Sequence, residues 1–283
     1  MPTDTNNKPL GNPTLHSSGK LPATQAPRPA LAALAIFLDL DGTLAPIAAT
    51  PDEAHVPVAT LHLLDDLYRA SAGSLAIVSG RDSPDIDRLL GPLILPYAAL
   101  HGARIRMPDG KIETLNVPQE SLQDISAMAE NRLRNLPGTI LERKALSVAL
   151  HYRNAPEFED EIRRLAADAL LKHHSVFEVQ EGKMVVEIKP RGASKAKAIE
   201  HFMGIAPFQG RIPLFVGDDL TDESAFGIVN ALDGISIKIG PGDTQANWRL
   251  DDPPALTAWL SSLLAAHVSN GGNASLDGRH GYE

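Results

Sequence analysis

Hydrophobic and polar positions follow two different patterns along the chain. Near its start, "LAALAIFL" (residues 31–38) is a continuous apolar run, which is typical of a strand covered on both faces. Residues 56–71 then place apolar side chains at helical spacing, and "SLAIVSG" (residues 74–80) is a second apolar run. Strands that alternate with helices at these lengths predict an α/β fold with a doubly wound parallel sheet.

The pattern changes at about residue 104. Residues 104–115 predict a hairpin with a Pro-Asp-Gly turn, and residues 139–153 alternate apolar and polar side chains, as in an antiparallel sheet with one wet face. The buried-strand pattern returns after Pro190. We therefore expect a core split around an inserted α+β cap. The expected parts are a disordered tail (1–30), a core (31–103 and 191–267), a cap (104–190) and a second disordered tail (268–283).

Composition narrows the class of protein. The 283 residues carry a net charge of -9, which argues against a nucleic-acid partner. Cysteine is absent, which excludes disulfides, thiolate catalysis and zinc sites built on cysteine. Apolar runs are too short to span a membrane, and the N-terminal segment is not that of a signal peptide. We expect a soluble, cytoplasmic protein without a membrane partner, and a monomer because heptad repeats are absent.

Four groups of polar residues lie where buried strands end or a helix begins. Asp39 and Asp41 follow the first strand, Ser79 follows the second and Asp218 a later one, while Lys195 begins a helix. In open parallel sheets, ligands bind at the carboxyl ends of the strands. Each group alone also fits an ordinary interpretation, namely a capped turn, a surface charge or a helix N-cap.

Taken together, these residues suit phosphoryl transfer. Carboxylates from two strands suit Mg²⁺, which prefers oxygen ligands and is commonly shared with phosphate. A hydroxyl with adjacent amides, and a lysine at a helix N-terminus, suit a phosphate group. One aspartate can then attack phosphorus to form an aspartyl-phosphate, and a second aspartate two residues on can protonate the leaving oxygen.

At this point four motifs carry a resemblance. "DLDGT", "SGR", Lys195 and "GDDLTD" resemble the four ordered motifs of the haloacid dehalogenase (HAD) superfamily of phosphatases. The similarity spans roughly residues 35–265. It implies a HAD-like, Rossmann-like core with an inserted α+β cap of a C2B-like type.

The resemblance also implies roles for the motif residues. Asp39 would be the nucleophile, Asp41 the general acid and base, and Ser79 and Lys195 would hold the phosphoryl group. Asp39, the backbone carbonyl of Asp41 and Asp218 would bind Mg²⁺. The other motif residues are Asp219 (a metal-site carboxylate or an N-cap), Asp222 (a partner of the metal or of Lys195), and Thr43, Gly80 and Arg81 beside the substrate.

The cap strands carry charged side chains on shared faces. Glu142 shares a face with Lys144, and His151 shares one with Arg153, because side chains alternate along a strand. Mixed charges suit a ligand with many hydroxyls, although an ordinary solvated sheet face has the same pattern. "LHGA", "LERKALSVALHYRNAP" and "MVVEIKPRGASKAKAI" resemble the trehalose-6-phosphate phosphatase family. The resemblance implies a substrate site that includes His101, Gly102, Glu142, Lys144, His151, Arg153 and Glu187.

The leading hypothesis is a Mg²⁺-dependent phosphatase that converts trehalose 6-phosphate to trehalose and phosphate in trehalose biosynthesis. Its small-molecule partner would be the sugar phosphate. One alternative is another capped sugar phosphatase, acting on sucrose phosphate or hexose phosphates. A further alternative is a regulatory domain that keeps the HAD-like fold without the chemistry.

Overall fold

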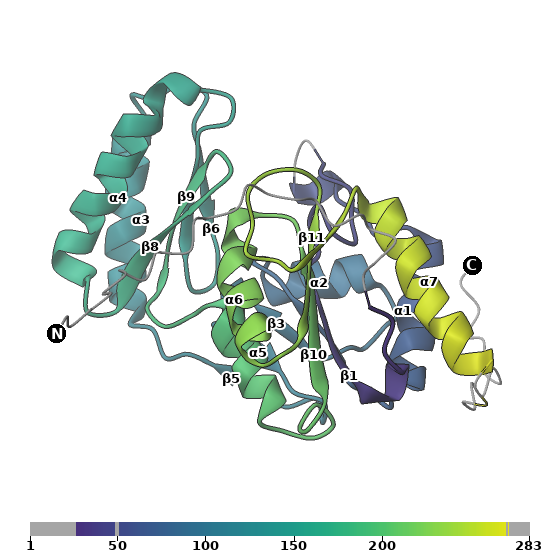
Figure 1. Ribbon diagram of the computed structural model, residues 1–283. Coiled ribbons are helices and arrows are strands. Elements are labelled where there is room, and N and C mark those ends of the chain that lie inside the picture. The colour runs from purple at the N-terminus through teal and green to yellow at the C-terminus, as the bar shows by residue number, and fades with distance from the viewer. Residues whose placement is uncertain (1–26, 49–50, 270, 272–283) are drawn as a thin grey trace, which may run out of the picture.

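The computed structural model describes residues 27–48, 51–269 and 271. Figure 1 shows a large sheet with helices on both sides and, on the left of the view, a smaller sheet backed by two helices. The larger part contains β1 (Leu34–Leu38), α1 (Val58–Ala70), β2 (Leu75–Val78), α2 (Ser83–Leu90), β3 (Tyr97–Ala99), β4 (Arg104–Arg106), β5 (Ile112–Thr114), α5 (Lys195–Met203), β10 (Ile212–Gly217), α6 (Glu223–Ala231), β11 (Ile235–Ile239), β12 (Trp248–Leu250) and α7 (Pro253–Ser269).

The main sheet is covered by helices on both faces. Its strand order is β12-β11-β10-β1-β2-β3-β4-β5, and the strands from β12 to β3 run parallel. Every residue of β1 is buried, which explains the unbroken apolar run in the sequence. Helices α1, α2 and α7 share one hydrophobic cluster with the sheet, and α5 and α6 share another on the opposite face. This arrangement confirms the predicted doubly wound α/β core.

The smaller part is the predicted insert. Its antiparallel sheet has the order β6-β7-β9-β8. Helices α3 and α4 pack on this sheet around Leu150, Ile162 and Ile188, and we call the unit the cap. Its elements are α3 (Gln119–Leu133), β6 (Ile140–Arg143), β7 (Val148–His151), α4 (Glu159–His173), β8 (Phe177–Gly182) and β9 (Val185–Pro190).

The hairpin of β4 and β5 lies elsewhere than expected. It was predicted within the insert, but β4 pairs antiparallel with β3, so the hairpin extends the main sheet. Ile105 of β4 is buried and joins the hydrophobic cluster beneath α5, which holds the hairpin to the core. Residues far from one another in sequence provide this packing, and a local pattern does not reveal it.

The ends of the chain and one strand also depart from expectation. Strand β12 was not predicted, because Leu250 is its only buried residue and three residues give no periodic signal. Helix α7 continues to Ser269, past the expected boundary at residue 267. The tails expected at 1–30 and 268–283 lie mostly outside the described residues. Within the described part of the chain, no helix is long and apolar enough to cross a membrane.

Candidate active site

A cavity of about 310 Å³ lies where the carboxyl ends of the central strands face the cap. Main-sheet and cap residues line it together, so segments far apart in the sequence meet there. Asp222 is fully buried and is not among the lining residues. Residues that the sequence placed in the site and that line the cavity are Asp39, Asp41, Ser79, Gly80, Arg81, His101, Glu142, Lys144, His151, Arg153, Glu187, Lys195, Asp218 and Asp219.

Asp39, Lys195 and Asp222 form a buried ionic cluster at the base of the cavity. Asp39 directly follows β1, and Lys195 is the first residue of α5. The Nζ of Lys195 donates to Asp39 Oδ1 at 2.8 Å and to Asp222 Oδ1 at 2.5 Å. Burial alone would lower the pKa of Lys195, but the Asp222 and Asp39 carboxylates outweigh burial and raise it. The lysine is therefore a fixed positive charge beside the predicted nucleophile.

Asp222 also fixes the loop that follows β10. Its Oδ2 accepts hydrogen bonds from the backbone amides of Asp218 and Asp219, both at 2.9 Å. Gly217 makes room for this contact, because a Cβ there would lie 2.4 Å from Asp222 Cγ. Asp219 occupies the N-cap position of the short 3₁₀ turn Leu220–Asp222. Of the two roles implied for Asp219, the geometry favours the N-cap.

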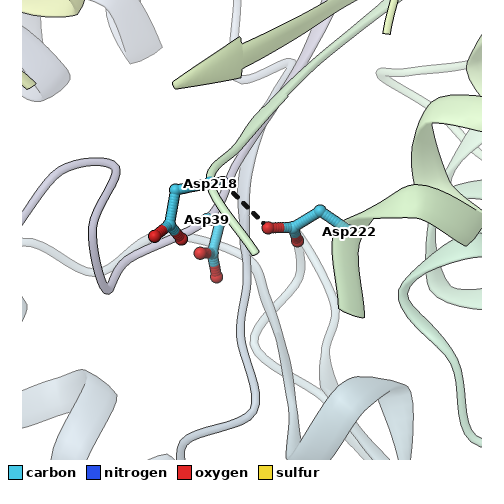
Figure 2. A group of neighbouring side chains, drawn as sticks. All are labelled: Asp39, Asp218 and Asp222. Atoms are coloured by element: carbon cyan, nitrogen blue, oxygen red, sulfur yellow. Dashed lines mark hydrogen bonds between the residues drawn. The ribbon is translucent and has the colours of Figure 1, made fainter. Parts of the chain in front are cut away.

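The carboxylates suit a small divalent cation. Oxygens of Asp39, Asp218 and Asp222 lie within 4.8 Å of one another, and Figure 2 shows the three side chains together. Both oxygens of Asp222 already accept hydrogen bonds, which leaves Asp39 and Asp218 as the available pair. Hard carboxylate oxygens of this kind suit Mg²⁺.

Space and charge around Asp218 support the same conclusion. Gly42 has φ +73°, and a Cβ there would lie 2.0 Å from Asp218 Oδ2, so the glycine makes room for the carboxylate. Burial, with Asp222 and Asp219 nearby, raises the pKa of Asp218 to about 7. Burial likewise raises the pKa of Asp39 well above its usual value, against the effect of Lys195. A bound cation would relieve this excess of buried negative charge.

Residues 79–81, which were predicted to lie beside the phosphoryl group, form one wall of the cavity. The amide of Arg81 donates to Ser79 Oγ at 3.2 Å, which closes a tight turn after β2. The Arg81 guanidinium donates to both oxygens of Asp41, each at 2.8 Å. The predicted acid and base is therefore held against the cavity wall, with its side chain 44% exposed.

On the cap side, the side chains pair with one another. His151 Nε2 lies 2.7 Å from Glu142 Oε2. Lys144 Nζ donates to Glu187 Oε1 at 3.2 Å. Arg153 donates to the backbone carbonyl of Lys183 at 3.4 Å. Acidic and basic groups therefore face the cavity and do not form a purely solvated sheet face.

Two residues predicted beside the substrate do not line the cavity. Thr43 is fully buried, and its Oγ1 has no hydrogen-bond partner among the described residues. Gly102 instead lies against the N-cap of α5, since a Cβ there would be 2.9 Å from the backbone oxygen of Ser194. The family resemblance implied both contacts, because Thr43 belongs to the DLDGT motif and Gly102 follows His101 in LHGA.

Sequence reasoning also missed some lining residues. Gln180 of β8 lies beside the cavity opposite Glu187 in the strand register. Asp85 in the first turn of α2 and Ile47 after β1 form part of the wall. The alternation along 177–182 could have selected Gln180, but the register that brings it to Glu187 depends on the folded sheet.

The main sheet and the inserted cap together define a capped haloacid dehalogenase-like fold. A solved haloacid dehalogenase-like hydrolase from B. subtilis has a TM-score of 0.60 and 14% identity to this chain, covering 81% of it and 99% of that structure. At this identity the likeness is one of fold. The predicted fold class is thereby confirmed.

Closer similarity defines the family. The trehalose-phosphatase family model matches residues 37–254. The trehalose-6-phosphate phosphatase of Escherichia coli (strain K12) is 46% identical over 245 residues, which cover 87% of this chain and 91% of that protein. A crystal structure of a trehalose-6-phosphate phosphatase related protein has a TM-score of 0.70 and 29% identity, covering 84% of this chain and 99% of that one. The chain belongs to the trehalose-phosphatase family, which confirms the prediction of a phosphoric monoester hydrolase.

Proposed function

We propose that this protein is a Mg²⁺-dependent, cytoplasmic, monomeric phosphatase that hydrolyses trehalose 6-phosphate to trehalose and phosphate. One observation carries the proposal. The buried Asp39–Lys195 pair faces Glu142 and Lys144 of the cap across a single cavity. A phosphate ester can then lie at the strand ends while its sugar contacts polar cap groups. The E. coli relative, named for this activity, supports the choice of substrate.

The reaction proceeds in two steps, formation of an aspartyl-phosphate and its hydrolysis. An oxygen of Asp39 forms a bond to phosphorus while the bond from phosphorus to the sugar oxygen breaks, and Asp41 gives its proton to that oxygen. After trehalose leaves, a water oxygen bonds to phosphorus and its proton passes to Asp41. The bond between phosphorus and Asp39 then breaks, which releases phosphate and restores both side chains.

Lys195 and Ser79 hold the phosphoryl group during these steps. The ammonium of Lys195 touches Asp39, so it lies beside the oxygens on which negative charge accumulates. The residues that would hold Mg²⁺ are Asp39 and Asp218 with their carboxylates and Asp41 with its backbone carbonyl. When bound, Mg²⁺ neutralises charge on the phosphoryl oxygens.

Arg81 controls when Asp41 is available. Both carboxylate oxygens of Asp41 accept hydrogen bonds from Arg81. To move a proton, Asp41 exchanges at least one of these bonds for the leaving oxygen of the substrate. A phosphate ester in the cavity offers Arg81 a second anionic partner, and this new contact offsets the hydrogen bond that Asp41 gives up.

A phosphate-release assay over a panel of phosphosugars tests the proposal. With Mg²⁺ present, the protein is expected to release phosphate fastest from trehalose 6-phosphate. Equal or faster release from sucrose, mannose or glucose phosphates would assign it to another capped sugar phosphatase. The Asp39→Asn variant is the control, since it keeps nearly the same shape. It is expected to fold normally and to lose turnover, and surviving activity would rule out Asp39 as the nucleophile.

A further inference from the structure

Lys238 is a buried lysine that the two reaction steps do not use. Strand β11 is buried at every residue from Ile235 to Ile239, and Lys238 is the only charged residue in it. Lys238 itself is 6% exposed. Burying a charged group is costly unless hydrogen bonds or an opposite charge compensate. A lysine at a position where an apolar residue would pack therefore indicates a specific task.

Lys238 lies next to the loop that carries Asp218. In the parallel pairing of β10 with β11, Lys238 is the partner of Gly217, and Asp218 follows Gly217 directly. Ser236 shares a sheet face with Lys238, because side chains alternate along a strand, and it donates to Asn230 of α6. The Lys238 side chain therefore extends on the α6 face of the sheet, at the edge where the strands end.

The ammonium of Lys238 binds backbone oxygens. Its Nζ donates to the Asp218 carbonyl and, at 3.0 Å, to the Ile239 carbonyl. Among the residues that the structure describes, it forms no ion pair, and it does not line the cavity. Lys238 therefore acts on the site through the backbone of Asp218 and does not touch the substrate.

The backbone of Asp218 is held from both sides. Its amide donates to Asp222 Oδ2 at 2.9 Å, and its carbonyl accepts from Lys238. With both groups fixed, the direction of the bond from Cα to Cβ is fixed as well. That bond directs the Asp218 carboxylate to the side of Asp39, where Figure 2 shows the two carboxylates together.

We propose that Lys238 is a positioning residue of the metal site, which holds the Asp218 carboxylate in place for Mg²⁺ by binding the Asp218 carbonyl. The inference rests on the Mg²⁺ site of the proposed function and adds to it a residue that contacts neither metal nor substrate. Groups that orient a metal ligand commonly change metal affinity by about 10- to 100-fold when they are removed.

The sign of the effect separates positioning from charge. Burial lowers the pKa of Lys238, while the Asp218 and Asp222 carboxylates act to raise it, so the lysine lies within electrostatic reach of the metal site. A positive charge near a cation site by itself weakens cation binding. If Lys238 acted through its charge alone, removing it would strengthen Mg²⁺ binding. If it holds Asp218 in place, removing it weakens Mg²⁺ binding.

The key variant is Lys238→Met, which keeps an unbranched side chain and removes the donor. Isothermal titration calorimetry with Mg²⁺, on the full-length chain without substrate, gives the dissociation constant. Titration at about pH 8.5 keeps Asp218 ionised, because its pKa is about 7. The dissociation constant is expected to rise about tenfold. A role in stability alone would lower the melting temperature and leave the dissociation constant unchanged.

The matched control is Arg249→Met. Arg249 of β12 is the register partner of Lys238 and donates to the carbonyls of Gly240 and Gly242, so it is a neighbouring cation that does not bind Asp218. Its loss is expected to leave the Mg²⁺ dissociation constant unchanged or slightly lower. Equal weakening of Mg²⁺ binding in Arg249→Met and Lys238→Met would overturn the proposal, because the contact with Asp218 would then not matter.

A second variant keeps the test decisive if methionine prevents folding. Lys238→Gln keeps a polar side chain, but its amide ends one bond short of the ammonium, so it is expected to weaken Mg²⁺ binding in the same direction. Circular dichroism confirms that each variant is folded at the temperature of the titration. Mg²⁺ binding that is equal or tighter in the folded Lys238 variants would overturn the proposal and leave the proposed function intact. An unaltered protein that binds no Mg²⁺ would overturn both.

Discussion

Replacing Lys195 by methionine would leave two buried carboxylates without the cation they share. Lys195 is 3% exposed, and its Nζ lies 2.8 Å from Asp39 and 2.5 Å from Asp222. Removing one partner of a buried ion pair costs about 3–5 kcal/mol. For a chain of this size, each kcal/mol lowers the melting temperature by about 2–4 °C, so we expect a decrease of roughly 6–20 °C at pH 7.

The loss in Lys195→Met should depend on pH. Burial already raises the pKa of Asp39 above its unfolded value, and removing the lysine raises it further. An acid with a raised pKa in the folded state weakens folding as pH rises from the unfolded pKa to the folded one. The free-energy deficit is therefore expected to be larger at pH 8 than at pH 5. Thermal denaturation followed by circular dichroism, without divalent ions, measures both values.

The matched control for this prediction is Lys189→Met. Lys189 is a buried lysine of the cap that donates to the Ala193 carbonyl and pairs with Glu178 at 3.1 Å. The Glu178 side chain is 32% exposed, so water can solvate it once the lysine is gone. The control should lose less stability and show little dependence on pH. A loss below about 1 kcal/mol in Lys195→Met, or one equal at the two pH values, would refute the reasoning.

Three further predictions concern the cation and the sugar. Mg²⁺ should raise the melting temperature more at pH 8 than at pH 5. Asp218 has a pKa of about 7, so below that pH a proton competes with the cation for its carboxylate. Equal rises in melting temperature at the two pH values would contradict this prediction. Gly42→Ala should abolish the Mg²⁺-induced rise in melting temperature, because the added Cβ would collide with Asp218. The control is Gly110→Ala, at φ +84° with open space around it, which should cost only about 1–2 kcal/mol of backbone strain and keep the rise. Glu142→Gln, which weakens the pair with His151, should lower kcat/KM for trehalose 6-phosphate about tenfold, and an unchanged value in steady-state kinetics would remove Glu142 from sugar recognition.

The sequence predicts which residues form the site better than it predicts which of them contact one another. Asp39, Ser79 and Asp218 each follow a buried strand, and parallel strands bring their carboxyl ends to one edge of the sheet. This geometry places them together without knowledge of distant packing. His101 and Glu187 are 86 residues apart, and only docking of the cap makes them partners. Local periodicity carries no record of that contact.

Unusual backbone conformation is a second reason why the sequence did not predict every position of the site. Thr43 follows two motif aspartates, yet the turn at Gly42 directs it into the core, where it is fully buried. Leu100 and His101 adopt left-handed conformations that residues with a Cβ seldom show. Pattern reasoning assumes ordinary backbone geometry, so it fails at such positions. His101 is also a position where the core contacts the cap, through Glu187.

Rapid acid quenching during turnover of trehalose 6-phosphate with Mg²⁺ tests directly whether Asp39 is the nucleophile. Borohydride reduction converts an aspartyl-phosphate to homoserine, and mass spectrometry of the peptide that contains residues 39–41 locates the change. We expect homoserine at position 39, aspartate at position 41, and no change when substrate is omitted. Phosphate release from trehalose 6-phosphate with Asp39 never modified would contradict it.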